Sequence, residues 1–175
     1  RKGKNEYAQQ LLLDPPEDLV HPIRWWRERA ILIRRALKDG HISVAYQLAR
    51  KHGLREEFRS SYINAEWLSG WIALQFLDEP EIALTHFSSM YAQVSMPISV
   101  ARAAYWAGRA AAKLKERELS QTFFEYAAAH QTTFYGQLAA EGLETPASLD
   151  TNSSAPKSAN LEDFRQTNLL RPAQM

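Results

Sequence analysis

Five histidines are the residues of this sequence best suited to acid–base or metal chemistry: His21, His41, His52, His86 and His130. None of them forms an H-x3-H or HExxH pattern, which would place two imidazoles on one helix face as metal ligands. The sequence contains no cysteine, which excludes thiolate ligands, thiol nucleophiles and disulfides. Its glycines form neither a GxGxxG fingerprint nor a P-loop. We therefore expect no metal site and no cofactor.

Carboxyl groups are the second candidates for chemistry, because a desolvated glutamic acid can serve as a general acid. Glu66 stands beside Trp67, and Glu125 stands beside Tyr126. Both lie in amphipathic segments, in which the neighbours of core residues usually face water. The sequence places no second carboxylate to act with either of them. We therefore predict no catalytic residue, and an all-α enzyme built on Glu66 stays an alternative.

Aromatic residues are the third group, and a ring with a polar edge can stack on a sugar. The set comprises Trp25, Trp26, Trp67, Trp71, Tyr105, Trp106, Phe134 and Tyr135. Most of them fall on helical stripes, which favours packing in the core. Adjacent residues on a helix point about 100° apart. One member of each pair, Trp25–Trp26 and Tyr105–Trp106, is therefore expected to reach a groove between repeats or a concave wall.

The composition predicts that helices position all these side chains. Ala (25) and Leu (20) far outnumber Val (4) and Ile (8). Alanine and leucine lose little free energy on entering a helix, whereas β-branched residues favour strands. The helix start and stop signals, among them the positions of Pro and Gly, predict helices at residues 7–13, 22–38, 42–51, 57–77, 80–92, 97–115, 118–130, 133–143 and 161–170. In this scheme Pro22 opens a helix, Gly53 is a left-handed C-cap and Asp78 is an N-cap.

The charges are nearly balanced, with 21 basic and 20 acidic residues, which argues against a dedicated nucleic-acid binder. No apolar run approaches the roughly 18 residues that a membrane span needs. Residues 1–60 hold 13 basic and 8 acidic side chains, a net of +5, whereas residues 61–100 hold four acids and no Lys or Arg. This basic end is expected either to be solvated or to contact an anionic polymer or another domain.

An internal repeat is the strongest architectural signal. Residues 65–73 align with residues 103–111 at an offset of 38, with Gly70 and Gly108 in phase. Each glycine is followed by a small residue and, four positions later, by Phe87 or Phe124. We interpret the glycines as places where a neighbouring backbone approaches too closely for a Cβ. The pattern predicts an all-α, right-handed superhelix or solenoid of tetratricopeptide-like hairpins, although the usual repeat is about 34 residues.

The chain divides into four segments on this basis. Residues 1–20 are expected to continue a preceding superhelix, and residues 21–143 to form the superhelical repeats. Residues 144–160 are rich in Ser, Pro and Asn and predict a linker. Residues 161–175 are expected to begin a helical segment that leads to a further domain. Because the sequence starts at Arg1 rather than Met, we expect it to be part of a longer polypeptide.

Four segments of the sequence together resemble the superhelical region of soluble lytic murein transglycosylases. They are WWRER (25–29), GWIAL (70–74), PISVARAAYWAGRA (97–110) and TTFYGQLA (132–139). The resemblance implies a parent enzyme that cleaves the MurNAc–GlcNAc bond of peptidoglycan to a 1,6-anhydro product. In that family the acid is a Glu in a Glu-Ser motif of a separate lysozyme-like domain. This chain has no Glu-Ser pair, so no catalytic residue is carried over.

The resemblance thus implies a non-catalytic scaffold that shapes the access of glycan strands to a catalytic domain outside this chain. It implies a bacterial periplasmic location, with glycan strands and the parent's own catalytic domain as partners; we expect a monomer. Arg109 and Tyr135 are the predicted substrate-binding residues if the surface binds glycan. The alternative from another class is a free-standing tetratricopeptide-like adaptor whose concave face binds a peptide of another protein.

Overall fold

The structure is a computed structural model that describes Leu12 and residues 20–143. Its helices are α2 (Pro22–Lys38), α3 (Ile42–Arg50), α4 (Arg59–Ile72), α5 (Pro80–Ala92), α6 (Pro97–Lys113), α7 (Arg117–Ala128) and α8 (Phe134–Gly142). A 3-10 turn, η1 (Glu56–Phe58), precedes α4, and a π-helical segment, η2 (Ala73–Leu77), extends it. No strand occurs in these described residues, so the predicted all-α class is confirmed for them.

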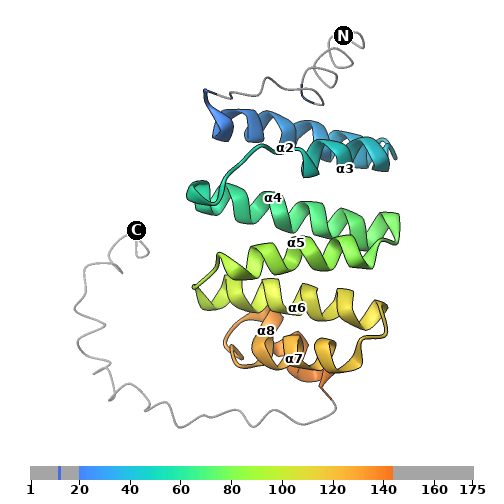
Figure 1. Cartoon of the computed structure of the whole chain (residues 1–175), viewed down its shortest axis with the longest axis vertical. Helices are drawn as coiled ribbons and strands as arrows, with labels where there is room; N and C mark the ends of the chain where they lie inside the picture. The colour runs from blue at the N-terminus through green and yellow to red at the C-terminus, as the bar shows by residue number, and fades with distance from the viewer. Residues whose placement is uncertain (1–11, 13–19, 144–175) are drawn as a thin grey trace, which may run out of the picture.

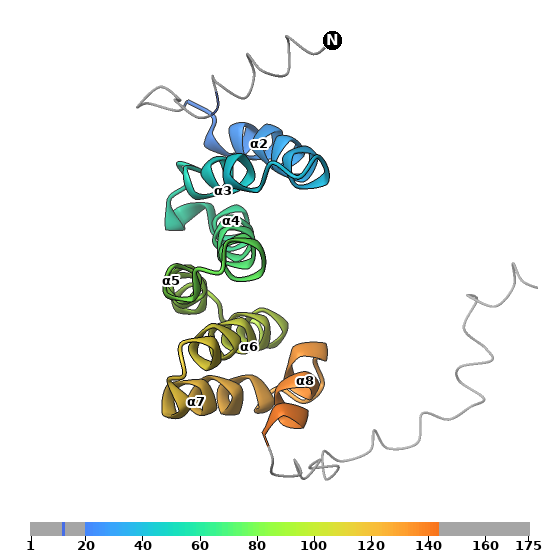
Figure 2. The same ribbon diagram turned by 90° about the vertical axis from the view of Figure 1, so that its right-hand side faces the viewer.

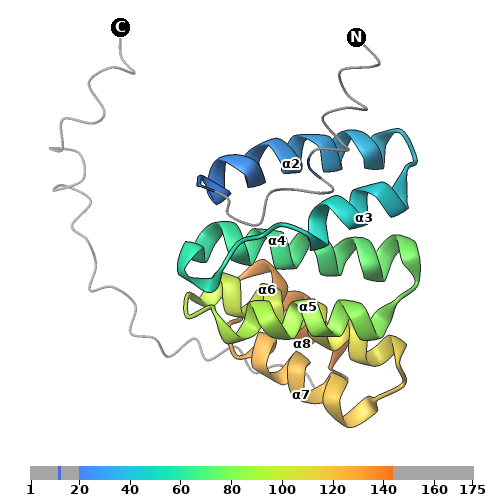
Figure 3. The same ribbon diagram turned by 45° about the horizontal axis from the view of Figure 1, so that its top comes forward.

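The helices from α2 to α7 stack one upon the next along the long axis, each running antiparallel to the one before (Figure 1). Figure 2 shows that α8 leaves this order and lies beside α6, on the opposite side of the stack from α5. Figure 3 shows the connection between α3 and α4, which runs past the end of the short α3 to the start of α4. As a result, α4, α6 and α8 lie on the same side of the molecule.

Most predicted helix boundaries agree with the structure, with two exceptions. The segment 57–77 was expected to be one helix, but it consists of η1, α4 and η2. Asp78 is not the N-cap of α5; its backbone is left-handed (φ 59°) and ends η2, and Glu79 is the N-cap. The Asp78 carboxylate instead pairs with Lys113 of α6. The predicted segments 7–13 (apart from Leu12), 144–160 and 161–170 lie outside the described residues.

The repeated glycines make room for a phenylalanine ring rather than for a backbone, which corrects the sequence interpretation. A Cβ on Gly70 would lie 2.8 Å from Cε1 of Phe87, and a Cβ on Gly108 would lie 2.9 Å from Cδ1 of Phe124. Each Phe comes from the second helix of its pair, α5 or α7. In each helix pair, the glycine of the first helix is therefore in direct contact with the phenylalanine of the second helix.

Helix α6 packs against α5, α7 and α8 at once. Its fully buried side chains are almost all alanines: Ala101, Ala103, Ala104, Ala107, Ala110 and Ala111. Small side chains on several faces allow neighbouring helices to approach closely from more than one side. Because α6 is rich in alanine, α8 can pack on one of its faces while α5 and α7 pack on its other faces. No helix of the described part is long and apolar enough to cross a membrane.

A candidate binding face built from aromatic rings and arginines

A continuous series of aromatic rings crosses the side of the molecule formed by α4, α6 and α8. We call this series the aromatic ladder; its members are Phe76, Trp71, Trp67, Trp106, Tyr105, Tyr135 and Phe134. Every member contacts the next, with ring centroids between 5.2 and 6.3 Å apart. Aromatic pairs at these separations attract one another in stacked or edge-to-face arrangements. The ladder therefore links three helices that are not consecutive in the chain.

The two ends of the ladder are open to solvent, whereas its middle rests on the core. Phe134 is 67% exposed and Phe76 is 47% exposed. The ring of Trp106 stacks on the fully buried Phe87, at an interplanar angle of 28°. Trp67 and Trp71 lie one turn apart on α4 and stack at 15°. The ladder is thus a semi-exposed apolar strip on a rigid support, which is the usual character of a binding surface.

Two arginines of α6 lie over the ladder. The guanidinium of Arg102 is 5.3 Å from the ring centre of Trp67. That of Arg109 is 5.8 Å from the centre of Tyr105 and 5.7 Å from that of Trp106. Cation–π contacts of this kind hold a guanidinium flat on a ring and leave its N–H edge available. Burial lowers the pKa of Arg102, while Arg109 is exposed.

Two indole donors of the ladder have no acceptor within the described structure. The Nε1 atoms of Trp67 and Trp106 are buried and form no hydrogen bond, and neither does Nε of Arg102. Buried polar groups are paired in the great majority of cases, and each exception calls for an explanation. Three such donors lie on or beside the ladder, and Nε and Nη2 of Arg29 and Oγ of Ser69 are likewise buried without a partner outside it.

The structure brings the two predicted substrate-binding residues to the same place. Arg109 and Tyr135 both contact Tyr105 and Trp106. Tyr105 and Trp106 are both half-buried, and the expectation that one of them reaches a groove between repeats stays a prediction.

The tryptophan pair on α2 behaves differently, because Trp26 is buried and Trp25 packs against the core. Neither belongs to the ladder. Nothing in the sequence predicted that Arg102 and Phe76 belong to this face, or in which order the rings contact one another.

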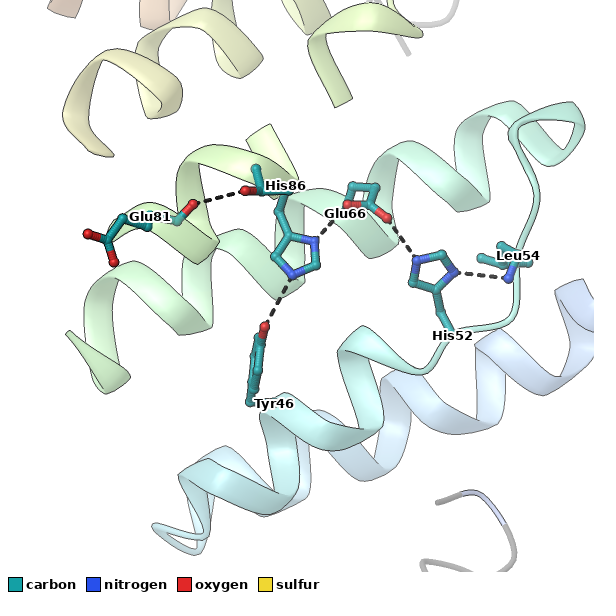
Figure 4. Close-up of polar contacts among 7 residues, drawn as sticks. Tyr46, His52, Leu54, Glu66, Glu81 and His86 are labelled. Carbon is teal, nitrogen blue, oxygen red and sulfur yellow. Dashed lines mark hydrogen bonds and ion pairs between the residues drawn. The ribbon is translucent and has the colours of Figure 1, made fainter. Parts of the chain in front are cut away.

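A second polar feature is buried between α3, α4 and α5 (Figure 4). Glu66 of α4 is only 7% exposed, and both of its oxygens bind histidines. Its Oε1 lies 2.9 Å from Nε2 of His52, and its Oε2 lies 2.7 Å from Nδ1 of His86. His86 Nε2 is 3.3 Å from the Tyr46 hydroxyl. The expectation that Glu66 faces water is therefore wrong.

The hydrogen bonds define the proton positions around Glu66. The backbone N–H of Leu54 donates to Nδ1 of His52, so the proton of that ring is on Nε2 and points to Glu66. A carboxylate only accepts, so Nδ1 of His86 also donates to it. Burial alone would raise the pKa of Glu66, but the hydrogen bonds that the two histidines donate, together with their electrostatic attraction, outweigh it and lower the pKa from 4.5 to about 2.

These properties are opposite to those of a general acid, which needs a raised pKa and a free proton. Glu66 is ionised at neutral pH and has both oxygens occupied, so it serves as a link between three helices. Glu125, the other carboxyl candidate, is exposed and accepts a hydrogen bond from Gln121 at 2.9 Å. No group of three or more potential metal ligands occurs among the residues that the structure covers.

Comparisons of the chain with known protein families, with curated proteins and with solved structures each found no match.

Proposed function

We propose that this chain is part of an α-superhelical scaffold of the lytic transglycosylase type, and that its aromatic ladder binds peptidoglycan strands. In this proposal the antiparallel helix pairs are tetratricopeptide-like units of a right-handed solenoid. The scaffold would act in the bacterial periplasm and direct glycan strands towards a catalytic domain of the same parent protein. It supplies shape and a binding surface, and the bond-breaking carboxylate belongs to that other domain.

The aromatic ladder is the observation that carries the proposal. Trp and Tyr rings bind sugars by covering the apolar face of a pyranose while their N–H or O–H groups satisfy its hydroxyls. A polysaccharide needs several such rings in a row, and the ladder supplies five Trp and Tyr rings, with a Phe ring at each end, over α4, η2, α6 and α8. The repeated Gly–Phe contact of the pairs α4–α5 and α6–α7 supports the repeat architecture.

Co-sedimentation with purified peptidoglycan sacculi tests the proposal. We expect the unaltered chain to sediment with the sacculi and to release no anhydromuropeptides. The double variant Phe76→Ala, Phe134→Ala removes only exposed rings, so the fold should persist. We expect it to bind about 5- to 10-fold more weakly, which corresponds to about 1–1.4 kcal/mol of lost binding free energy.

Tyr126→Ala is the matched control, because Tyr126 is a 48% exposed aromatic residue on α7 outside the ladder. It should leave the retained fraction unchanged. If the unaltered chain stays in the supernatant, the glycan proposal fails and the peptide-binding adaptor takes its place. Release of anhydromuropeptides would overturn the assignment of a non-catalytic scaffold.

A further inference from the structure

We propose that Arg102 and Arg109 make the aromatic ladder selective for a glycan whose lactyl carboxylates are free, each arginine pairing with one carboxylate. This inference rests on the proposed function, because it specifies which form of the glycan the ladder takes. The muramic acid units of peptidoglycan carry one lactyl group each, and that group is an anion when no peptide is attached to it.

Neither arginine forms a salt bridge with a carboxylate of the described residues. The salt bridges formed by the described residues are His52–Glu66, Arg55–Glu57, His86–Glu66 and Lys113–Asp78. Arg102 instead donates from Nη2 to Asn64 Oδ1 at 3.5 Å, and Arg109 donates from Nη1 to the Tyr105 hydroxyl at 3.1 Å. Both partners are neutral. The face therefore carries two positive charges that no carboxylate of its own neutralises.

The charge of Arg102 is partly desolvated, whereas Arg109 is exposed. Arg102 is half-buried with its Nε unpaired, and burial lowers its pKa. A guanidinium that has lost part of its water gains more from an anionic partner than a fully solvated one does. Its planar fork matches a carboxylate, which can accept two parallel hydrogen bonds. A neutral sugar hydroxyl offers neither the charge nor this geometry.

The spacing of the two arginines along α6 is close to the repeat of the glycan. Arg102 and Arg109 are seven residues apart on α6, two helical turns, which gives a rise of about 10 Å along the same face. In a glycan of alternating GlcNAc and MurNAc, successive lactyl groups are separated by one disaccharide, a comparable length. The rings of Trp67, Trp106 and Tyr105 lie under the two guanidinium groups and hold them in place on this face. Two successive carboxylates of one strand would then pair with Arg102 and Arg109 where the ladder crosses α6.

The test is isothermal titration of the chain with two tetrasaccharides of alternating GlcNAc and MurNAc, one with free lactyl carboxylates and one with lactyl amides. We expect the carboxylate form to bind about 10-fold or more tightly, because hydrogen bonds to charged groups are the stronger ones. Its affinity should fall as salt is raised, and that of the amide form should not. Arg109→Gln should lower the affinity for the carboxylate form about 5- to 10-fold and that for the amide form by a smaller factor.

Arg34→Gln serves as the matched control, because Arg34 is an exposed arginine on α2 outside the ladder. It should change neither affinity. Arg102→Lys keeps the charge but loses the fork, and we expect it to lower the selectivity for the carboxylate. Equal affinities for the two tetrasaccharides would overturn this inference while leaving the glycan proposal standing. If neither tetrasaccharide binds and sacculi are not retained, the proposed function itself fails.

Discussion

Replacement of Glu66 by alanine is expected to lower the free energy of unfolding by about 3–5 kcal/mol. The carboxylate joins His52 and His86, which come from different sides of α4, in an environment that is 7% exposed. Its removal leaves two buried imidazole N–H groups without an acceptor and opens a cavity between α3, α4 and α5. The measurement is urea unfolding followed by far-ultraviolet circular dichroism, with the midpoint and slope compared between variants.

Two further variants separate the charge from the packing. Glu66→Gln keeps the shape and can still accept one histidine N–H, so we expect a smaller loss of about 1–3 kcal/mol. Glu125→Gln changes an exposed glutamate of α7 and should alter stability by less than about 0.5 kcal/mol. Equal stabilities of Glu66→Ala and Glu125→Gln would show that the Glu66 network does not hold the helices together.

The lowered pKa of Glu66 also predicts a pH dependence. A carboxyl group whose folded pKa is below its unfolded value stabilises the fold above the unfolded pKa, here 4.5. That stabilisation is lost as pH falls from about 4.5 to about 2. Glu66→Gln should therefore show a shallower decline of stability over this interval than the unaltered chain. Identical pH profiles of the two proteins would contradict the assigned ionisation.

Replacement of Gly136 by alanine is expected to destabilise the chain by about 2–4 kcal/mol, despite the higher helix propensity of alanine. A Cβ at this position would overlap the carbonyl oxygen of His130, which is backbone and cannot move aside. It would also lie 2.9 Å from Oγ1 of Thr133, the N-cap that accepts the Gly136 N–H. Thermal unfolding measures the loss, and ladder-dependent glycan binding should weaken with it because α8 carries Phe134 and Tyr135.

Gly142→Ala is the matched control in the same helix. Nothing lies within 4 Å of a Cβ at Gly142, so the substitution gains only helix propensity. We expect stability to stay the same or to rise by up to about 1 kcal/mol. If Gly136→Ala were as stable as Gly142→Ala, the close turn between α7 and α8 would be placed incorrectly.

The helices could be predicted from the sequence because their signals are local. Pro22, Pro80 and Pro97 each stand at the first position of a helix, and Gly40 and Gly53 adopt the left-handed backbone that follows one. The break of the segment 57–77 was missed because η2 (ALQFL) consists of residue types that are also common in α-helices. A π-helical turn leaves no residue-type signal of its own.

The buried network and the ladder could be predicted only in part, because both depend on contacts between distant residues. Glu66 lies 14 residues from His52 and 20 from His86, spacings that belong to no motif. Arg109 and Tyr135 were predicted from the sequence independently of each other. Both contact Tyr105 and Trp106 because α8 lies beside α6. The fully buried Arg29, whose pKa burial lowers to about 10, departs from the rule that charged residues face water.

The most direct measurement of the central claim is the nuclear magnetic resonance spectrum of the five tryptophan indole N–H groups during titration with peptidoglycan glycan strands. Trp67, Trp71 and Trp106 belong to the ladder, whereas Trp25 and Trp26 lie on α2 and serve as internal references. We predict that the three ladder resonances shift with increasing glycan and that the two α2 resonances stay in place. Shifts confined to Trp25 and Trp26, or five unchanged resonances at saturating glycan, would contradict a glycan-bearing face on α4, α6 and α8.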